Sequence, residues 1–183
     1  LPLRFDRPSF DRSALTPSER GTAIHLAMQY LRYEHCGNSE EIRSELLRLL
    51  ERKLLTQQQY EAVDPKRIAA FFASELGQRV LHAPNLVREF KFSVLEDAGR
   101  YDPQLAGEQV LLQGVTDCCL VEADGIVILD FKSDRIRTGG EAERAEFYCG
   151  QLDAYSRALS EIFNLPVKQR VLWFFTTDTA YYM

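Results

Sequence analysis

The sequence lacks several features that would have placed it in a well-defined class. None of its four cysteines, Cys36, Cys118, Cys119 and Cys149, stands in a C-x-x-C pair or another zinc-type spacing. We therefore expect reduced, mostly buried thiols in a cytosolic protein. No apolar run approaches the length of a membrane span, so we expect no membrane partner. A Walker-type phosphate loop is also missing, which argues against an ATPase within this chain.

An excess of basic residues is missing too. The 22 Lys and Arg residues are outnumbered by 27 Asp and Glu residues, which gives a formal net charge of −5. Free-standing nucleic-acid binders usually carry a basic surface, so the composition argues against tight binding of nucleic acid by this chain alone. No signal peptide is present, and the chain begins Leu1-Pro2 rather than with Met. We expect it to be a piece of a longer protein.

What is present suits a single globular domain. The 183 residues are 45% hydrophobic and 27% charged, which is ordinary for a soluble protein with a sizeable core. Residues 1–15 show no periodicity and are expected to form a linker or arm, and residues 16–183 are expected to form the domain. Amphipathic patterns with capping residues predict helices from Pro17 to about Glu34, from Glu40 to about Lys53 after a Ser39 cap, from Gln57 after a Thr56 cap, and from Pro65.

The most informative stretch is a predicted β-hairpin near the middle of the chain. Aliphatic runs at 110–121 and 126–131 flank an Asp-Gly turn. Folding back brings Asp117 close to Asp130, and Lys132 points to the same face as Asp130 because strand side chains alternate. Two carboxylates and an ammonium suit a divalent metal beside a phosphate. Alternatively, Lys132 is a structural partner of Asp130, because an isolated charge is costly to bury.

Three further features lie near this hairpin in the sequence. A strand is predicted over 86–95 with Glu89 in it, either as a site residue or in a salt bridge with a neighbouring cation. Arg135 and Arg137 follow Lys132, either to meet phosphates or to lie in a solvated loop. A long helix is predicted over 141–163, followed by an apolar strand within 165–177. The expected buried stripe of that helix is Tyr148, Leu152, Tyr155, Leu159 and Ile162.

Together, and in this order, these features resemble the RecB-like branch of the PD-(D/E)XK nuclease superfamily. The resemblance covers 17–177, and the residues within and around the motifs are most similar to those of the nuclease domains of AddA-type helicase–nucleases. The matching motifs are Gly21-x-x-x-His25, Glu89-Phe90, Gly114-x-x-Asp117, Asp130-Phe131-Lys132 and Gln151-x-x-x-Tyr155.

The resemblance implies a fold and a set of site residues. The fold is α/β, a restriction-endonuclease-like core with a mixed central sheet flanked by helices, plus an N-terminal helical segment. The implied catalytic residues are Glu89, Asp117, Asp130 and Lys132. The implied metal ligands are His25, Asp117, Asp130 and Phe131, and the residues implied to contact DNA or support the site are Gln151, Tyr155, Arg135 and Arg137. Without the resemblance, His25 suits a core-edge histidine bonded to a carbonyl.

The implied function is a Mg²⁺-dependent DNA exonuclease, with Mn²⁺ able to take the place of Mg²⁺. It would act in double-strand-break end processing and recombinational repair in the bacterial cytoplasm, with single-stranded or unwound DNA and an AddB-like partner protein. Only a helicase part missing from this chain would use ATP. The four cysteines do not match the iron–sulfur pattern of some relatives, so no cluster is expected. The alternative is a catalytically inactive nuclease-like module that binds DNA or docks a partner.

Overall fold

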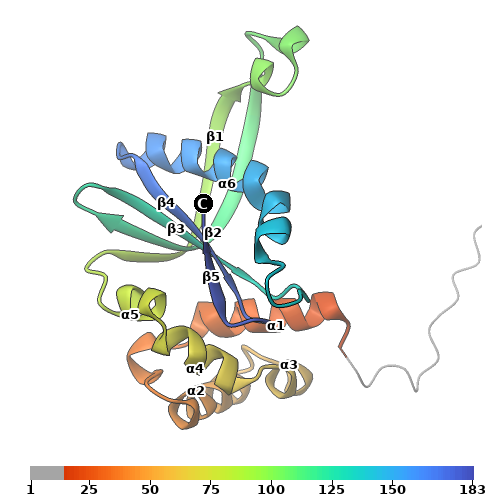
Figure 1. The fold of residues 1–183 in the computed structure, drawn as a ribbon, viewed down its shortest axis with the longest axis vertical. Helices are drawn as coiled ribbons and strands as arrows, with labels where there is room; N and C mark the ends of the chain where they lie inside the picture. Colours follow the sequence, from red (N-terminus) through yellow and green to blue (C-terminus); the bar gives the residue numbers. More distant parts are fainter. Residues whose placement is uncertain (1–14) are drawn as a thin grey trace, which may run out of the picture. The chain divides into compact units, whose positions relative to one another are not determined.

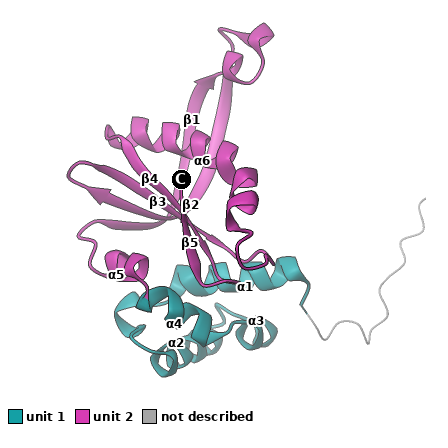
Figure 2. Cartoon of the chain, viewed as in Figure 1, with its two compact units in different colours: residues 1–73 teal, residues 74–183 magenta. Residues whose placement is uncertain are grey.

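The computed structural model describes residues 15–183. The chain divides between Ala73 and Ser74 into two compact units, a helical unit and a sheet unit (Figure 2). The arm predicted for residues 1–15 lies, apart from Leu15, outside the described residues. Within the described part, no helix combines the length and the apolar character needed to cross a membrane.

The helical unit follows the capping residues of its sequence. Thr16 and Thr56 each form a capping box, with Glu19 and Gln59 respectively. The predicted Ser39 cap is wrong: the Asn38 side chain accepts from the backbone N–H groups of the next helix, and Ser39 is its first residue. The first helix ends four residues earlier than predicted, and a short 3-10 turn follows. The elements are α1 (Pro17–Tyr30), η2 (Tyr33–His35), α2 (Ser39–Glu51), α3 (Gln57–Ala62) and α4 (Pro65–Ala73).

A buried carboxylate sits on α2 of this unit. Glu45 is only 4% exposed. Its oxygens pair with Arg32 at 2.5 Å and with Arg48 at 2.8 Å. The Arg32 hydrogen bonds, joined by those of Arg48, outweigh burial and lower the pKa of Glu45 to about 2. The ionised form of Glu45 is therefore favoured in the folded state.

This ion cluster should make the chain acid-sensitive. The pKa of Glu45 is lower in the folded state than its ordinary value of 4.5. Its contribution to folding stability is therefore fully present at pH values above 4.5 and is lost as the pH falls toward about 2. Arg32 is half exposed, so we expect the contribution to be modest, about 1–2 kcal/mol. Denaturant unfolding of the parent and Glu45→Gln between neutral pH and pH 2 should show the stability difference shrinking through this window. Glu51→Gln, on the exposed end of the same helix, is the control. A pH-independent difference would contradict the prediction.

The sheet unit contains one mixed sheet. Its strand order is β1-β2-β3-β4-β5; β3 and β4 are parallel and the other neighbours are antiparallel (Figure 1). This confirms the predicted α/β class. The elements are α5 (Glu75–Leu81), β1 (Leu86–Asp97), η3 (Ala98–Arg100), η4 (Pro103–Leu105), β2 (Gln109–Glu122), β3 (Gly125–Lys132), α6 (Glu141–Phe163), β4 (Val167–Phe174) and β5 (Thr179–Tyr182).

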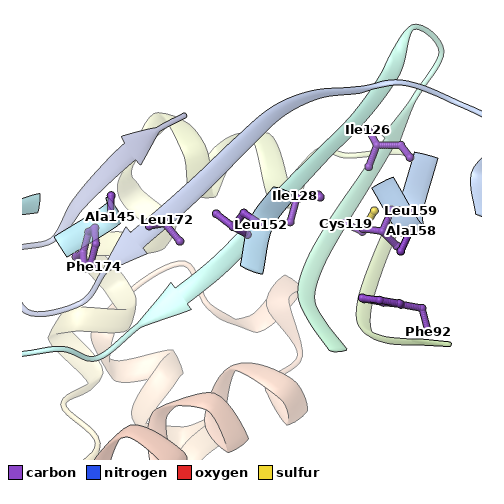
Figure 3. Packing of buried hydrophobic residues seen from close by; sticks show 10 residues of the cluster. All are labelled: Phe92, Cys119, Ile126, Ile128, Ala145, Leu152, Ala158, Leu159, Leu172 and Phe174. Carbon is purple, nitrogen blue, oxygen red and sulfur yellow. The ribbon is translucent and has the colours of Figure 1, made fainter. Parts of the chain in front are cut away.

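The core of this unit lies between the sheet and α6. Leu152 and Leu159 of α6 pack with Ile128 of β3 and Leu172 of β4 (Figure 3). Almost every side chain of β3 is buried, which explains its continuous apolar sequence. Ile162 was expected in the buried stripe of α6 but is 42% exposed. Position 162 therefore faces away from the core, whereas Phe163 in the same turn packs against it.

Beyond the five-stranded region, β1 and β2 continue as a two-stranded ribbon. They pair from Leu86↔Leu120 to Asp97↔Gln109, whereas β2 pairs with β3 only from Cys118 onward. The η3 and η4 turns occupy the ribbon's tip (Figure 1). Glu96, near this tip, is held by Arg157 of α6 at 2.9 Å. The long helix thus supports both the sheet and the ribbon.

Candidate active site

The place where β2 stops pairing with β3 positions the first carboxylate. The ladder runs up to Cys118↔Leu129. One residue further, the Asp117 side chain takes the place of a main-chain acceptor: its Oδ2 receives the N–H of Phe131 at 2.6 Å. The Asp117 carboxylate therefore lies against the peptide that joins Asp130 to Phe131, as the hairpin geometry suggested.

Asp130 and Lys132 form a largely buried ion pair. Their side chains are 9% and 13% exposed, and Nζ lies 2.7 Å from Oδ2. The two residues point the same way, as the strand alternation predicted. Lys132 also sits over the ring of Tyr148 on α6, with Nζ 3.6 Å from the ring centroid. This arrangement holds the ammonium in one place and balances the buried charge of Asp130.

A polar network lies behind the Tyr148 ring. Its hydroxyl donates to Asp134 Oδ2 at 2.7 Å, and Arg144 pairs with Asp134 Oδ1 at 2.6 Å. Burial, with the Asp134 hydrogen bond, raises the pKa of Tyr148 to about 12. Burial of Asp134 works against its ionisation, but the hydrogen bonds from Tyr148 and Arg144 leave its pKa lowered. The ring below Lys132 is consequently a neutral phenol near pH 7, held by an ionised carboxylate.

Glu89 has an unusual backbone. Its φ is +50°, a left-handed conformation that is rare for a residue with a long side chain. The pairing of β1 with β2 has the same register on both sides of Glu89. Arg88 pairs with Cys118 and Phe90 pairs with Thr116, but Glu89 and Asp117, which lie between them, do not form a ladder pair. Glu89 and Asp117 therefore occupy facing positions on adjacent strands, where the ladder is interrupted. Backbone strain of this kind is commonly found at functional sites.

Gly114 provides space for an aromatic ring from α6. A Cβ at this position would lie 2.5 Å from Cζ of Phe92 and 2.7 Å from Cε1 of Tyr155. These two rings meet edge to face, with centroids 4.9 Å apart. The hydroxyl of Tyr155 accepts a hydrogen bond from Gln151 Nε2 at 3.1 Å. The glycine of G-x-x-D and the tyrosine of Q-x-x-x-Y are thus parts of one packing arrangement.

The remaining predicted residues are placed as follows. Arg135 and Arg137 are exposed on the segment between β3 and α6. His25 is half buried on α1 of the helical unit, and its role as a metal ligand stays a prediction. Sequence reasoning assigned no role to Asp134 or Arg144. The one signal for them was their position: Asp134 lies two residues after Lys132, and Arg144 lies one helical turn before Tyr148.

The oxygen donors near Lys132 suit a hard divalent cation such as Mg²⁺. Among residues 15–183, no group of three or more His, Cys, Asp and Glu side chains is assembled to hold a metal. Asp117 lies against the peptide between Asp130 and Phe131, so two carboxylates with hard oxygen donors come from neighbouring positions on β2 and β3. Mg²⁺ is commonly held by one or two carboxylates, with substrate phosphate and water completing its shell. The donor chemistry therefore fits a hard divalent cation bound together with substrate.

The cysteines are unlike metal ligands in their surroundings. All four are free thiols, and Cys36, Cys118 and Cys119 are buried. Burial raises the pKa of Cys119 to about 11, which disfavours the thiolate that a metal would need. The expected lack of an iron–sulfur cluster stays a prediction.

Comparison with known proteins agrees with the motifs. Residues 3–182 match the model of the PD-(D/E)XK nuclease superfamily. The chain is 41% identical over 174 residues, 92% of its length, to the ATP-dependent helicase/nuclease subunit of Desulforamulus reducens. It is 40% identical over 94% of its length to the protein of that name from Pelotomaculum thermopropionicum, and 38% over 94% to that from Bacillus velezensis.

These relatives are much longer proteins. The chain spans only 14% of the first two and 15% of the third. The match to the family model, by contrast, covers nearly all of this chain, including every motif residue described above. The chain therefore belongs to the PD-(D/E)XK nuclease superfamily.

Proposed function

We propose that this chain is a metal-dependent deoxyribonuclease domain that cleaves DNA strands as an exonuclease. One observation carries the proposal. The Asp117 carboxylate is hydrogen-bonded to the Phe131 N–H, beside the buried Asp130–Lys132 pair. A purely structural ion pair needs no second carboxylate at its side, whereas two neighbouring carboxylates are a common way to hold a divalent cation at a phosphate.

The proposed roles follow from position. Asp117, Asp130 and the Phe131 carbonyl would hold Mg²⁺, or Mn²⁺ in its place. The bound ion would polarise the scissile phosphate and lower the pKa of a bound water. Lys132 would stabilise the negative charge that develops on the phosphate. Tyr148 would keep the ammonium in position for this, and Glu89 would orient Lys132 or a water.

Other residues would guide the strand. Gln151 and Tyr155 would support the site from α6. Arg135 and Arg137 would meet phosphates. The acidic composition predicts weak, salt-sensitive DNA binding by this chain alone. Tethering within a longer protein would raise the effective concentration of the strand without new contacts.

The relatives' names support a wider proposal. They are called ATP-dependent helicase/nuclease subunits. We infer that this chain serves in a helicase–nuclease complex of the bacterial cytoplasm, with an AddB-like partner. The complex would process double-strand breaks for recombinational repair, and ATP would be used by its helicase part.

The basic activity can be tested directly. End-labelled single-stranded DNA should be shortened in the presence of Mg²⁺ or Mn²⁺ and should stay intact with EDTA. Binding to the same DNA is measured in EDTA by fluorescence anisotropy. Binding without cleavage under any metal condition would favour the inactive module over the nuclease.

A further inference from the structure

A pocket opens next to the candidate site, where the β3–α6 segment meets the first turns of α6. Its volume is about 550 Å³, within the range of small-ligand pockets. Residues 136–140 form one side of it, and Glu143, Arg144 and Phe147 form the other. All of these residues belong to the sheet unit.

Phe147 is the outstanding feature of this pocket. Its side chain is 72% exposed, more than that of Leu95, Tyr101 or Leu111. The Arg144 guanidinium lies 4.8 Å from its ring centroid. Arg144 is itself fixed by Asp134. The exposed ring is thus supported on one side by a cation that is already held in place.

An exposed aromatic ring and an exposed arginine meet at this pocket. Arg144 is balanced by Asp134, and Arg137 shares the lining with the acidic Glu143, so the ring rather than the net charge would carry the recognition. An exposed aromatic ring beside an arginine is the combination with which proteins hold a base and its phosphate. A stable protein–protein interface takes about 20–30 residues from each side, whereas eight residues line this pocket.

The pocket is also connected to the candidate catalytic lysine. Arg144 and Tyr148 share Asp134, and the Tyr148 ring lies under Lys132. Phe147 and Tyr148 are consecutive on α6, one at the pocket and the other at the ion pair. A strand whose phosphate lies at Lys132 would therefore have a neighbouring nucleotide within reach of the pocket.

We propose that this pocket is a nucleotide subsite in which Phe147 stacks on a base and Arg137 contacts a phosphate of the same strand. The proposal rests on the proposed function, because it takes the strand to be the nuclease substrate. Inside a duplex both faces of a base are covered by its neighbours, so Phe147 can stack only on a base of a single strand or at a strand end.

The test compares two short single strands of equal length, one normal and one with abasic residues throughout. Both carry the same phosphates, so their affinity ratio measures the contribution of the bases. The parent should bind the normal strand more tightly. Phe147→Ala should lower that ratio by roughly tenfold, the usual size of one stacking contact. Phe147→Trp should restore it, and Ile162→Ala, an exposed apolar residue on the same helix, should leave it unchanged.

Binding is measured in EDTA and cleavage in Mg²⁺, so the two proposals fail separately. If the parent cleaves but Phe147→Ala keeps the parent's ratio, the subsite is refuted and the nuclease stands. If the parent binds with a Phe147-dependent ratio but does not cleave, the subsite stands and the nuclease is refuted. A parent that does not distinguish the two strands also refutes the subsite.

Discussion

Asp117→Asn and Asp130→Asn should both reduce DNA cleavage by roughly 10²–10³-fold or more, but only the second should destabilise the fold. An asparagine at 117 keeps a side-chain oxygen that can accept the Phe131 N–H. An asparagine at 130 leaves the buried Lys132 ammonium without its carboxylate. Breaking a buried pair costs about 3–5 kcal/mol, and the Tyr148 ring should keep the loss near the lower limit.

The measurement is thermal melting of the parent and both variants, in EDTA and in Mg²⁺, beside a cleavage assay. Mg²⁺ should raise the parent's melting temperature by mass action and raise that of each variant much less. Asp153→Asn provides a matched control, because Asp153 lies on the surface of α6, where it pairs with Arg170 of β4. If both variants melt far below the parent in EDTA and the parent does not respond to Mg²⁺, the site is structural.

Gly114→Ala should destabilise the sheet unit by about 1–3 kcal/mol, an effect out of proportion to one methyl group. The new Cβ would lie within 2.8 Å of atoms of both Phe92 and Tyr155. One of the rings must move, and a shift of Tyr155 also disturbs its hydrogen bond with Gln151. Cleavage should therefore fall together with stability.

Urea unfolding measures this effect, and Gly150→Ala is the control. A Cβ at Gly150 meets no atom within 4 Å, and alanine favours the helix, so this variant should be more stable by up to about 1 kcal/mol. Phe92→Leu should partly rescue Gly114→Ala, because it removes the ring carbon closest to the new methyl. Additive losses in the double variant would contradict the proposed packing.

Much of the sheet unit could be predicted because its signals are local. The Asp-Gly turn fixed the β2–β3 hairpin, and the 3.6-residue period gave α6 its observed bounds, 141–163. β5 was missed because Thr179–Tyr182 is too short to show a pattern. α5 was missed as well, although Ser74 is a proper N-cap. Local pattern is weak in such short elements, and neighbouring elements stabilise them.

The site was predictable in its members but not in its contacts. The D-x-K spacing placed Asp130 and Lys132 on one face, because alternation is a property of any strand. The contact of Lys132 with Tyr148 joins residues of β3 and α6, and no sequence period relates them. The left-handed backbone of Glu89 depends on the facing strand and was equally out of reach. The only sign of this backbone conformation in the sequence is the Arg88-Glu89 pair, which interrupts the alternation of apolar and polar residues between Val87 and Phe90.

The missing ladder pair between Glu89 and Asp117 bears on how such a domain can gain or lose its acidic residues in evolution. Val87 and Phe90 both pack on the core between the sheet and α6, although regular alternation would put them on opposite faces. On β2, Leu112 and Cys119 also pack on that core, although they are seven residues apart and would lie on opposite faces of a regular strand. Each strand thus carries one residue more than a regular ladder needs.

Those two additional residues are the acidic ones. Deleting both together would give β1 and β2 unbroken alternation in the same pairing, with loss of the hydrogen bond from the Phe131 N–H to Asp117. The pairing of β1 with β2 therefore does not depend on these two acidic residues, whereas the buried Lys132 does depend on Asp130. A lineage could lose the activity through one paired deletion and keep the fold, and an existing hairpin could acquire the carboxylates by the reverse route.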